Sequence, residues 1–352
     1  MSPTKADHHL DLRAGEIVEV RSSEEILATL DPNGTLESMP FMPEMLPYCG
    51  QRFRVAKRAD KTCDNIEPWN MRRVENAVHL TGVRCDGTAH SDCDAGCFIF
   101  WKEAWLKRAN SEFLDPSQIA SPGPSVLDTS SLSPRRSVCT LETLQKATRR
   151  EAESLAAGED VFTCQATELR KFTSNLPWWD FRQYVRDVRS RNFHRGLGAT
   201  KSDKFIETLL ASIDVLRVLL VPLFNTLQSF RHGMHYPHLQ GALHAATPKE
   251  ELGLQPGDFV QVKSREEIVA TLDQRNRNRG LLFDSEMLRY CGGKFRVLKR
   301  VHKIVDEKTG KIMFMKSACI ILDGVACAAD YHALCPRAIY HYWRENWLRR
   351  VP

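Results

Sequence analysis

The chain lacks the short motifs that mark the commonest enzyme classes. Its 352 residues contain no phosphate-binding G-x-x-x-x-G-K-[ST] loop, no G-x-G-x-x-G, no G-x-S-x-G and no H-E-x-x-H. The sequence therefore gives no reason to place nucleotide-dependent enzymes, α/β-hydrolases or zinc proteases first.

A long apolar run free of charge is also missing. The most apolar stretch, residues 205–230, contains Glu207, Asp214, Arg217 and Pro222, and is therefore a poor transmembrane span. It fits a helix packed on the protein, or an amphipathic helix lying on a membrane surface between basic flanks. The first 16 residues carry no apolar core of a secretory signal. We therefore expect a cytoplasmic chain that is either free or peripheral to the inner membrane.

The net charge and the cysteine content indicate the kind of partner and the cellular compartment that the sequence favours. A formal net charge of +5 permits an anionic partner but does not demand nucleic acid, which stays open as the less expected partner. Eleven cysteines without a signal indicate a reducing compartment, where thiols stay free or bind metal. The odd number argues against a complete set of disulfides.

One block of sequence occurs twice at a fixed offset of 242 residues. Gly15–Arg108 aligns with Gly257–Arg350 without a gap, and 37 of the 94 positions are identical. Between the copies lies a Ser/Pro-rich stretch typical of a linker, followed by stretches with helical character, 139–170, 176–190 and 205–230. The sequence predicts four parts: an N-terminal module (12–109), a linker (110–138), a helical middle region (139–250) and a C-terminal module (251–352).

Each copy has the pattern of a small, β-rich module. Alternating runs predict strands at 16–21, 52–58 and 77–83, and at the matching positions of the second copy. Ser22 with Glu25, and Ser264 with Glu267, fit capping boxes of short helices. Two tryptophans one turn apart predict a short terminal helix at 101–106 and again at 343–348. The expected fold class is α+β, with two SH3-like modules on either side of a helical region.

Three cysteines and a histidine keep metal-ligand spacing in both copies. C-x4-H-x2-C follows a more distant Y-C-G cysteine, and Cys3His is a standard structural zinc set. The sequence thus predicts two zinc ions per chain, on Cys49, Cys85, His90 and Cys93, and on Cys291, Cys327, His332 and Cys335. Four protein ligands would leave no open position, which favours a structural role. If the histidine points away, an open three-cysteine site results.

The first copy alone carries Cys63, His79 and Cys97, where the second has valine or isoleucine. These three residues are candidates for a third metal or redox site and for catalysis. Ordinary drift with free buried thiols explains them equally simply. Cys139 and Cys164 lie in the middle region, and Cys164 is a nucleophile only if a base lies close in space.

Each second strand presents a basic face. The side chains are Arg52, Arg54, Arg58 and Lys61 in the first copy, and Lys294, Arg296, Arg300 and Lys303 in the second. Such a face can hold phosphates or other anions, or can simply be solvated.

Several of these segments resemble an uncharacterised family of bacterial proteins with duplicated Cys/His repeats. The resemblance rests on E-M-L-x-Y-C-G, K-T-C-D, the 77–97 segment A-V-H-L to A-G-C, F-W-K-E-A-W-L, C-Q-A-T-E-L-R and L-P-W-W-D-x-R-Q-Y. Some members are encoded near surface-polysaccharide or specialised-metabolite genes. The resemblance implies no particular activity, but it includes Cys63, His79 and Cys97.

Two functions remain open at this point. The first is a zinc-binding repeat protein that acts as a binding or assembly factor for an anionic partner, in part at a membrane surface through 205–230. The second is a metal-dependent enzyme of a biosynthetic pathway with its active site in the N-terminal module.

Overall fold

The chain is a mixed α and β structure, rich in strands and with few helices. The computed structural model describes residues 9–66, 70–109, 139–150, 160–177, 179–189, 201–231, 236–244 and 246–351. The expected linker 110–138 lies outside these residues. Two units divide the chain: the first takes 1–211 with the short segments 305–312 and 335–337, and the second takes 212–304, 313–334 and 338–352.

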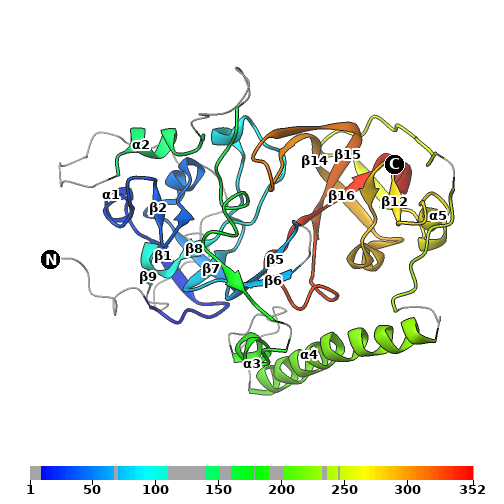
Figure 1. The fold of residues 1–352 in the computed structure, drawn as a ribbon, viewed down its shortest axis with the longest axis horizontal. Helices are drawn as coiled ribbons and strands as arrows, with labels where there is room; N and C mark the ends of the chain where they lie inside the picture. Colours follow the sequence, from blue (N-terminus) through cyan, green and yellow to red (C-terminus); the bar gives the residue numbers. More distant parts are fainter. Residues whose placement is uncertain are drawn as a thin grey trace. The chain divides into compact units, whose positions relative to one another are not determined.

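The first unit is built on an antiparallel five-stranded sheet, coloured blue to cyan in Figure 1. Its order is β8 (Trp101–Lys102), β7 (Ala77–Leu80), β4 (Arg52–Arg58), β1 (Ile17–Val20) and β9 (Leu106–Arg108). A smaller sheet has the order β10 (Ser174–Asn175), β6 (Asn70–Arg73) and β5 (Lys61–Asp64), and β2 (Thr35–Leu36) pairs with β3 (Met39–Pro40). The middle region thus adds a strand to the N-terminal module.

The second unit has a five-stranded sheet with the corresponding order. It runs β16 (Tyr340–Arg344), β15 (Ile312–Ala326), β14 (Lys294–Val305), β11 (Phe259–Val262) and β17 (Leu348–Arg350), with β12 (Arg277–Asn278) paired to β13 (Leu281–Leu282). The registers match at the offset of 242, since Val18 faces Phe53 and Val260 faces Phe295. The strands predicted from alternation are confirmed.

Both predicted capping boxes are present. Ser22 caps α1 (Ser23–Leu27) and Ser264 caps α5 (Arg265–Val269), each with reciprocal bonds to the glutamate three residues on. In the middle region the helices are α2 (Leu141–Lys146), α3 (Arg182–Arg189) and α4 (Lys201–Phe230). The two repeat copies also contain short 3₁₀ helices: η2 (Pro43–Tyr48), η3 (Thr88–His90), η4 (Glu103–Trp105), η8 (Ser285–Tyr290) and η9 (Glu345–Trp347).

Two helix predictions were wrong. The 101–106 and 343–348 segments each form a strand, one 3₁₀ turn and a second strand. The two tryptophans of each pair lie on two successive elements, a strand and a 3₁₀ turn, and both are buried in the core. Because they are four residues apart, their spacing in the sequence resembles one turn of an α-helix. In 139–170, the described residues are helical only over α2, and Arg149 and Phe162 form a β-bridge instead.

The tryptophan pairs anchor the two cores in the same way. Trp101 and Trp105 are fully buried in the first unit, as are Trp343 and Trp347 in the second. Phe41 meets Trp105 edge to face at 5.2 Å, and Phe283 meets Trp347 at 5.2 Å. Such contacts add about 1 kcal/mol to area burial.

A buried glutamate closes each module. Glu103 is fully buried and accepts hydrogen bonds from the backbone N–H groups of Leu10, Asp11 and Leu12. Arg58 Nη1 donates to the same carboxylate at 2.6 Å. Glu345, Arg300 and Leu254 repeat this arrangement in the second unit. The carboxylate therefore holds the segment before β1, or before β11, against the basic strand.

Figure 1 shows the long helix α4, whose second part exposes a row of apolar side chains. The exposed side chains follow steps of three and four residues: Ile213, Leu216, Leu220, Leu223, Leu227 and Phe230. Among the described residues, no helix is sufficiently long and apolar to cross a membrane.

Candidate metal centres and an arginine-lined pocket

A glutamate, a cysteine and a histidine meet in the first unit. Glu44 comes from η2, Cys85 follows β7, and His90 ends η3, and their ligand atoms lie within 4.8 Å of one another. His90 Nδ1 lies 2.5 Å from Glu44 Oε1, and Cys85 Sγ lies 3.8 Å from the same oxygen. Nitrogen, sulfur and carboxylate oxygen are the donors that zinc accepts. The three residues form a metal-capable group.

The second unit holds a group of the same composition. Glu286 from η8, Cys327 and His332 bring their ligand atoms within 4.8 Å. Cys327 Sγ lies 3.5 Å from His332 Nδ1. Each residue stands 242 positions after its counterpart, so the same backbone frame places both groups.

Each histidine is oriented from behind by an oxygen. His90 Nε2 lies 3.0 Å from the carbonyl of Thr163, which can only accept, so Nε2 carries a proton and Nδ1 faces Glu44. His332 Nε2 lies 3.4 Å from Asp284 Oδ2, again with Nδ1 toward the cysteine. Metal-binding histidines characteristically donate their other N–H to a carbonyl or carboxylate. Both rings are therefore arranged as ligands are.

The glutamates leave one oxygen unused. Oε2 of Glu44 and Oε2 of Glu286 are buried and form no hydrogen bond with any residue that the structure describes. A buried carboxylate oxygen without a partner is costly, and a cation would remove that cost. Sequence reasoning missed both residues, although E-M-L-x-Y-C-G carries a glutamate at the same place in each copy.

Burial and neighbouring charge shape the acidity of these groups. Burial raises the pKa of Cys85 well above its ordinary value, and the Glu44 carboxylate adds to this. Burial alone would lower the pKa of His332, but its bonds with Asp284 and Cys327 outweigh burial and raise it to about 11. A bound cation would favour the thiolate in each group.

The groups contain two members of each predicted Cys3His set. Cys49 and Cys291 directly follow η2 and η8 and pack against the two cores. Burial raises the pKa of Cys49 to about 12 and that of Cys291 to about 11. Cys93 Sγ accepts a hydrogen bond from the Val305 N–H at 3.3 Å. Cys335 belongs to the first unit, where its Sγ accepts from the Cys63 N–H at 3.0 Å.

Arg337 interacts with Cys63, Cys97 and His79, the three residues that only the first copy carries. It donates to the Cys63 carbonyl at 3.3 Å. Burial raises the pKa of Cys97 to about 12, and the Arg337 charge acts against this rise. His79 is completely buried, with Nδ1 2.8 Å from the Ile99 carbonyl, and its Nε2 bonds no residue in the described part of the chain. Burial lowers the pKa of His79 to about 3, and the nearby charges of Lys57, Arg84 and Arg337 lower it further.

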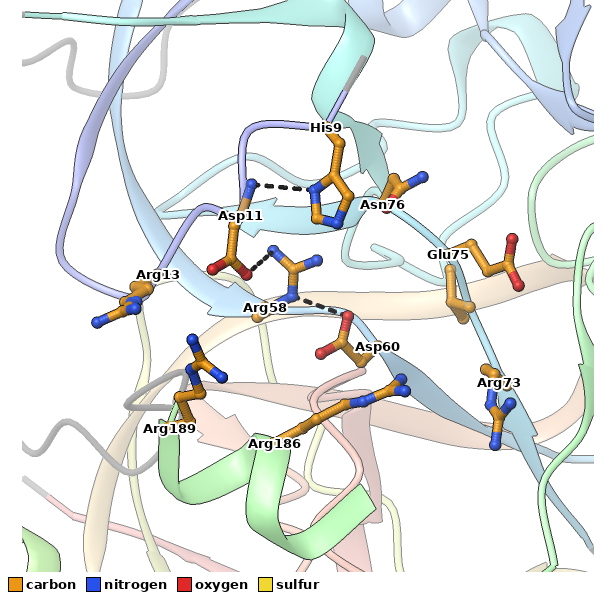
Figure 2. A pocket seen from close by; sticks show the side chains of 11 residues that line it. His9, Asp11, Arg13, Arg58, Asp60, Arg73, Glu75, Asn76, Arg186 and Arg189 are labelled. Carbon is orange, nitrogen blue, oxygen red and sulfur yellow. Dashed lines mark hydrogen bonds and ion pairs between the residues drawn. The ribbon is translucent and has the colours of Figure 1, made fainter. Parts of the chain in front are cut away.

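A polar pocket of about 710 Å³ opens elsewhere in the first unit (Figure 2). Five arginines and three acidic residues contribute to its lining: Arg13, Arg58, Arg73, Arg186, Arg189, Asp11, Asp60 and Glu75. Arg58 is tied to Asp60 at 2.8 Å and to Glu103. Arg73 pairs with Asp180 at 2.6 Å.

Helix α3 brings two of these arginines to the pocket. Lys61 Nζ lies 2.5 Å from Asp187 Oδ2, with both side chains buried, and lies 5.0 Å from the centre of the Tyr184 ring. This ion pair fixes α3 on β5. Arg186 and Arg189, one turn apart on α3, consequently line the pocket; in Figure 2, Arg189 lies beside Arg13 and Arg186 extends below Asp60 toward Arg73.

The predicted basic face of β4 and β5 is thus largely occupied. Arg52 pairs with Glu19 at 3.2 Å, and Arg54 donates to the Gly15 carbonyl at 3.1 Å. Lys61 is buried against Asp187, and only Arg58 of the four lines the pocket.

No family model matches the chain, and no similar curated protein or solved structure was found. The site therefore has to be interpreted from its own geometry.

We expect Cys327→Ser to lower the metal content of the folded chain by one equivalent, because the second group loses its sulfur ligand. Elemental analysis of the purified protein measures this. Cys319→Ser is the matched control, since Cys319 is buried in the same unit but outside the group. Equal metal in wild type and Cys327→Ser contradicts the assignment.

Acid should destabilise the chain partly through His79. Its pKa is about 3 when folded and about 6.5 when unfolded, so the unfolded state alone gains a proton between these values. Stability from this residue is thus present above pH 6.5 and is lost as the pH falls toward 3. Between pH 7 and pH 5 the loss is about 2 kcal/mol.

His79→Ile, the residue found at the matching position 321, should abolish this part of the pH dependence. Urea unfolding of both proteins at pH 7 and pH 5 measures it. An equal loss in wild type and variant contradicts a neutral buried His79.

Proposed function

We propose that this chain is a zinc-organised repeat protein that acts as a binding or assembly factor for an anionic ligand, which it binds in the arginine-lined pocket of the first unit. The two Glu–Cys–His groups supply the zinc sites. With both glutamates and His90 buried, the metals would serve as fixed points of the fold.

Three arginines carry the proposal, and one of them, Arg186, also acts on the Asp60 carboxyl through its charge. The side chains of Arg13, Arg186 and Arg189 line the pocket but form no hydrogen bond or ion pair with any described residue. Several guanidinium groups held together repel one another, and an anion between them relieves that repulsion. The planar guanidinium matches phosphate and carboxylate oxygens in pairs.

The volume of the pocket and its acidic residues indicate the chemical class of the ligand. A volume of about 710 Å³ is within the usual range for a small molecule. Asp11, Asp60 and Glu75 would repel a purely anionic polymer but can accept hydrogen bonds from hydroxyl groups. A phosphorylated molecule with several hydroxyl groups therefore fits better than nucleic acid does.

Arg186→Gln should weaken binding of a sugar phosphate by about tenfold or more, because one charge-assisted hydrogen-bonding group is lost. Calorimetric titration of the full chain with glucose 1-phosphate and with inorganic pyrophosphate measures this. The binding should also weaken with added salt.

Arg54→Gln is the control for that experiment. Arg54 lies on the exposed face of β4, outside the pocket, and tests the strand face as the alternative site. A large effect of Arg54→Gln with none from Arg186→Gln would move the site to the strand face. No heat with either probe at low salt would contradict an anion site in the pocket.

The same proposal includes a peripheral membrane contact through α4. The apolar row from Ile213 to Phe230 is exposed, and Arg231 follows it directly. An amphipathic helix with a basic flank is suited to an anionic bilayer surface.

Replacing Leu216 and Leu223 together with glutamate should abolish flotation of the chain with vesicles containing phosphatidylglycerol. Both side chains are more than half exposed, so the change affects the surface rather than a core. Phe314→Glu, an exposed aromatic position on β15, is the control. A wild-type chain that stays at the bottom of the gradient in low salt contradicts the contact.

A metal-dependent enzyme of a biosynthetic pathway is the second candidate. The three-residue group in the first unit leaves coordination positions open, as catalytic zinc sites do, and His79 keeps an unpartnered Nε2. Loss of metal in Cys63→Ser would favour this candidate, because Cys63 lies outside both groups.

A further inference from the structure

Two cysteines from different copies of the repeat contact each other within the first unit. Cys63 lies on β5, and its N–H donates a hydrogen bond to Cys335 Sγ at 3.0 Å, although the two residues are 272 positions apart. Only the Cα and Cβ atoms separate the Cys63 sulfur from that nitrogen, so the two thiols are close neighbours. Neither forms a disulfide in this structure.

The duplication repeats this contact with one of the two sulfurs replaced. At the offset of 242, Val305 matches Cys63 and Cys93 matches Cys335. The Val305 N–H donates to Cys93 Sγ at 3.3 Å, so the contact between backbone and sulfur occurs twice. A thiol on the donor residue is present only at Cys63. The contact therefore comes from the duplicated frame, whereas the second thiol is particular to the pair of Cys63 and Cys335.

Arg337 and Glu307 hold the backbone around Cys63. The Arg337 side chain is buried and donates to the Cys63 carbonyl at 3.3 Å and to Glu307 Oε1 at 2.8 Å. The same carboxylate oxygen accepts from Asn65 Nδ2 at 3.1 Å. Because these bonds fix the chain beside Cys335, the two sulfurs can come within bonding distance by rotation of their side chains.

The surroundings of Cys335 favour its thiolate. Burial alone would raise its pKa, but hydrogen bonds from the Cys63 thiol and from the N–H groups of Arg337 and Cys63 outweigh burial and lower the pKa below its ordinary value. The Arg337 charge acts in the same direction. Thiolates, rather than thiols, attack disulfide bonds. Cys335 is thus suited to attack a sulfur atom held at Cys63.

The two thiols differ in their access to solvent. Cys63 is partly exposed, whereas Cys335 is only 3% exposed. A small disulfide molecule from solvent can therefore reach Cys63, while Cys335 is left to react with its neighbour. One thiol that meets the external disulfide and a second that resolves the mixed disulfide are the parts that thiol–disulfide exchange requires.

A metal ion fits this pair less well than a disulfide does. Protein zinc sites use three or four protein ligands. In the described part of the chain, the groups of three adjacent ligand atoms include neither Cys63 nor Cys335. The pair therefore has the number of sulfurs that a disulfide needs, without the further ligands of a metal site.

We propose that Cys63 and Cys335 form a thiol–disulfide exchange site that reacts with low-molecular-weight disulfides. The site does not depend on the arginine-lined pocket or on the zinc sites. In a reducing compartment, its disulfide would be a transient state, as cytosolic disulfides usually are.

The exchange proceeds in two steps. The Cys63 thiol gives its proton to the Cys335 thiolate and attacks the external disulfide, so that one S–S bond forms, another breaks and the first small thiolate leaves. That thiolate takes the proton back from Cys335, which then attacks the Cys63 sulfur and releases the second small thiolate. The protein loses two electrons, and the external disulfide gains them.

Peptide mapping of the full chain tests the site. The reduced protein is incubated with 2-hydroxyethyl disulfide, quenched with acid and N-ethylmaleimide, digested without reductant and examined by mass spectrometry. Wild type should yield a cross-linked peptide that contains Cys63 and Cys335. Cys335→Ser should instead retain one mercaptoethanol on Cys63. Cys63→Val, which introduces the residue found at position 305, should give neither the cross-link nor a modified Cys335.

Cys93→Ser is the matched control, because Cys93 has the same contact with a backbone N–H but faces a valine. It should leave the cross-link unchanged. Absence of the Cys63–Cys335 peptide from fully oxidised wild type would overturn the proposal, and this measurement does not depend on the folding of any variant. So would a main product in which Cys63 is joined to another cysteine.

Discussion

The Glu103 carboxylate is the interaction on which the first unit most depends. It is fully buried, and it collects three backbone N–H groups and the Arg58 guanidinium. A buried carboxylate without these partners would cost several kcal/mol, so the partners must be in place when the module folds. The segment that it holds carries Asp11 and Arg13, and Arg58 lies beside them. The geometry of the arginine-lined pocket therefore follows from a structural ion pair.

The second unit repeats the fold of the first but has fewer additions from the middle region. Glu345 and Arg300 repeat the clamp, and the group with Cys327 repeats the metal-capable site. The difference lies in what is added to the frame. In the first unit, α3 supplies arginines to the pocket, and Thr163 and Gln165 of the middle region bond His90 and Phe100. The middle region thus adds the arginine-lined pocket to one of two similar modules.

Local patterns predicted well wherever a feature depends on near neighbours. The strands follow from alternation, the capping boxes from a serine and a glutamate three residues apart, and the pairs Cys85–His90 and Cys327–His332 from close spacing. Glu44 was missed because an acidic residue in a short turn is usually exposed to solvent, and its sequence neighbours do not show that it is buried. The helix predicted at 101–106 was wrong, since burial of two tryptophans on successive elements imitates a helical period.

The sequence by itself determined the duplication, the strand-rich modules and the short-range members of each metal-capable group, because all of these are written in spacing along the chain. Only the tertiary structure decided which residues that are distant in the sequence lie close together in space. Arg13 and Arg186 line one pocket although they are more than 170 residues apart, and Thr163 contacts His90 across 73 residues. Such encounters depend on buried partners such as Glu103, Lys61 and Gln165, whose pairing has no periodic signature. For that reason the candidate sites emerged from packing rather than from motifs.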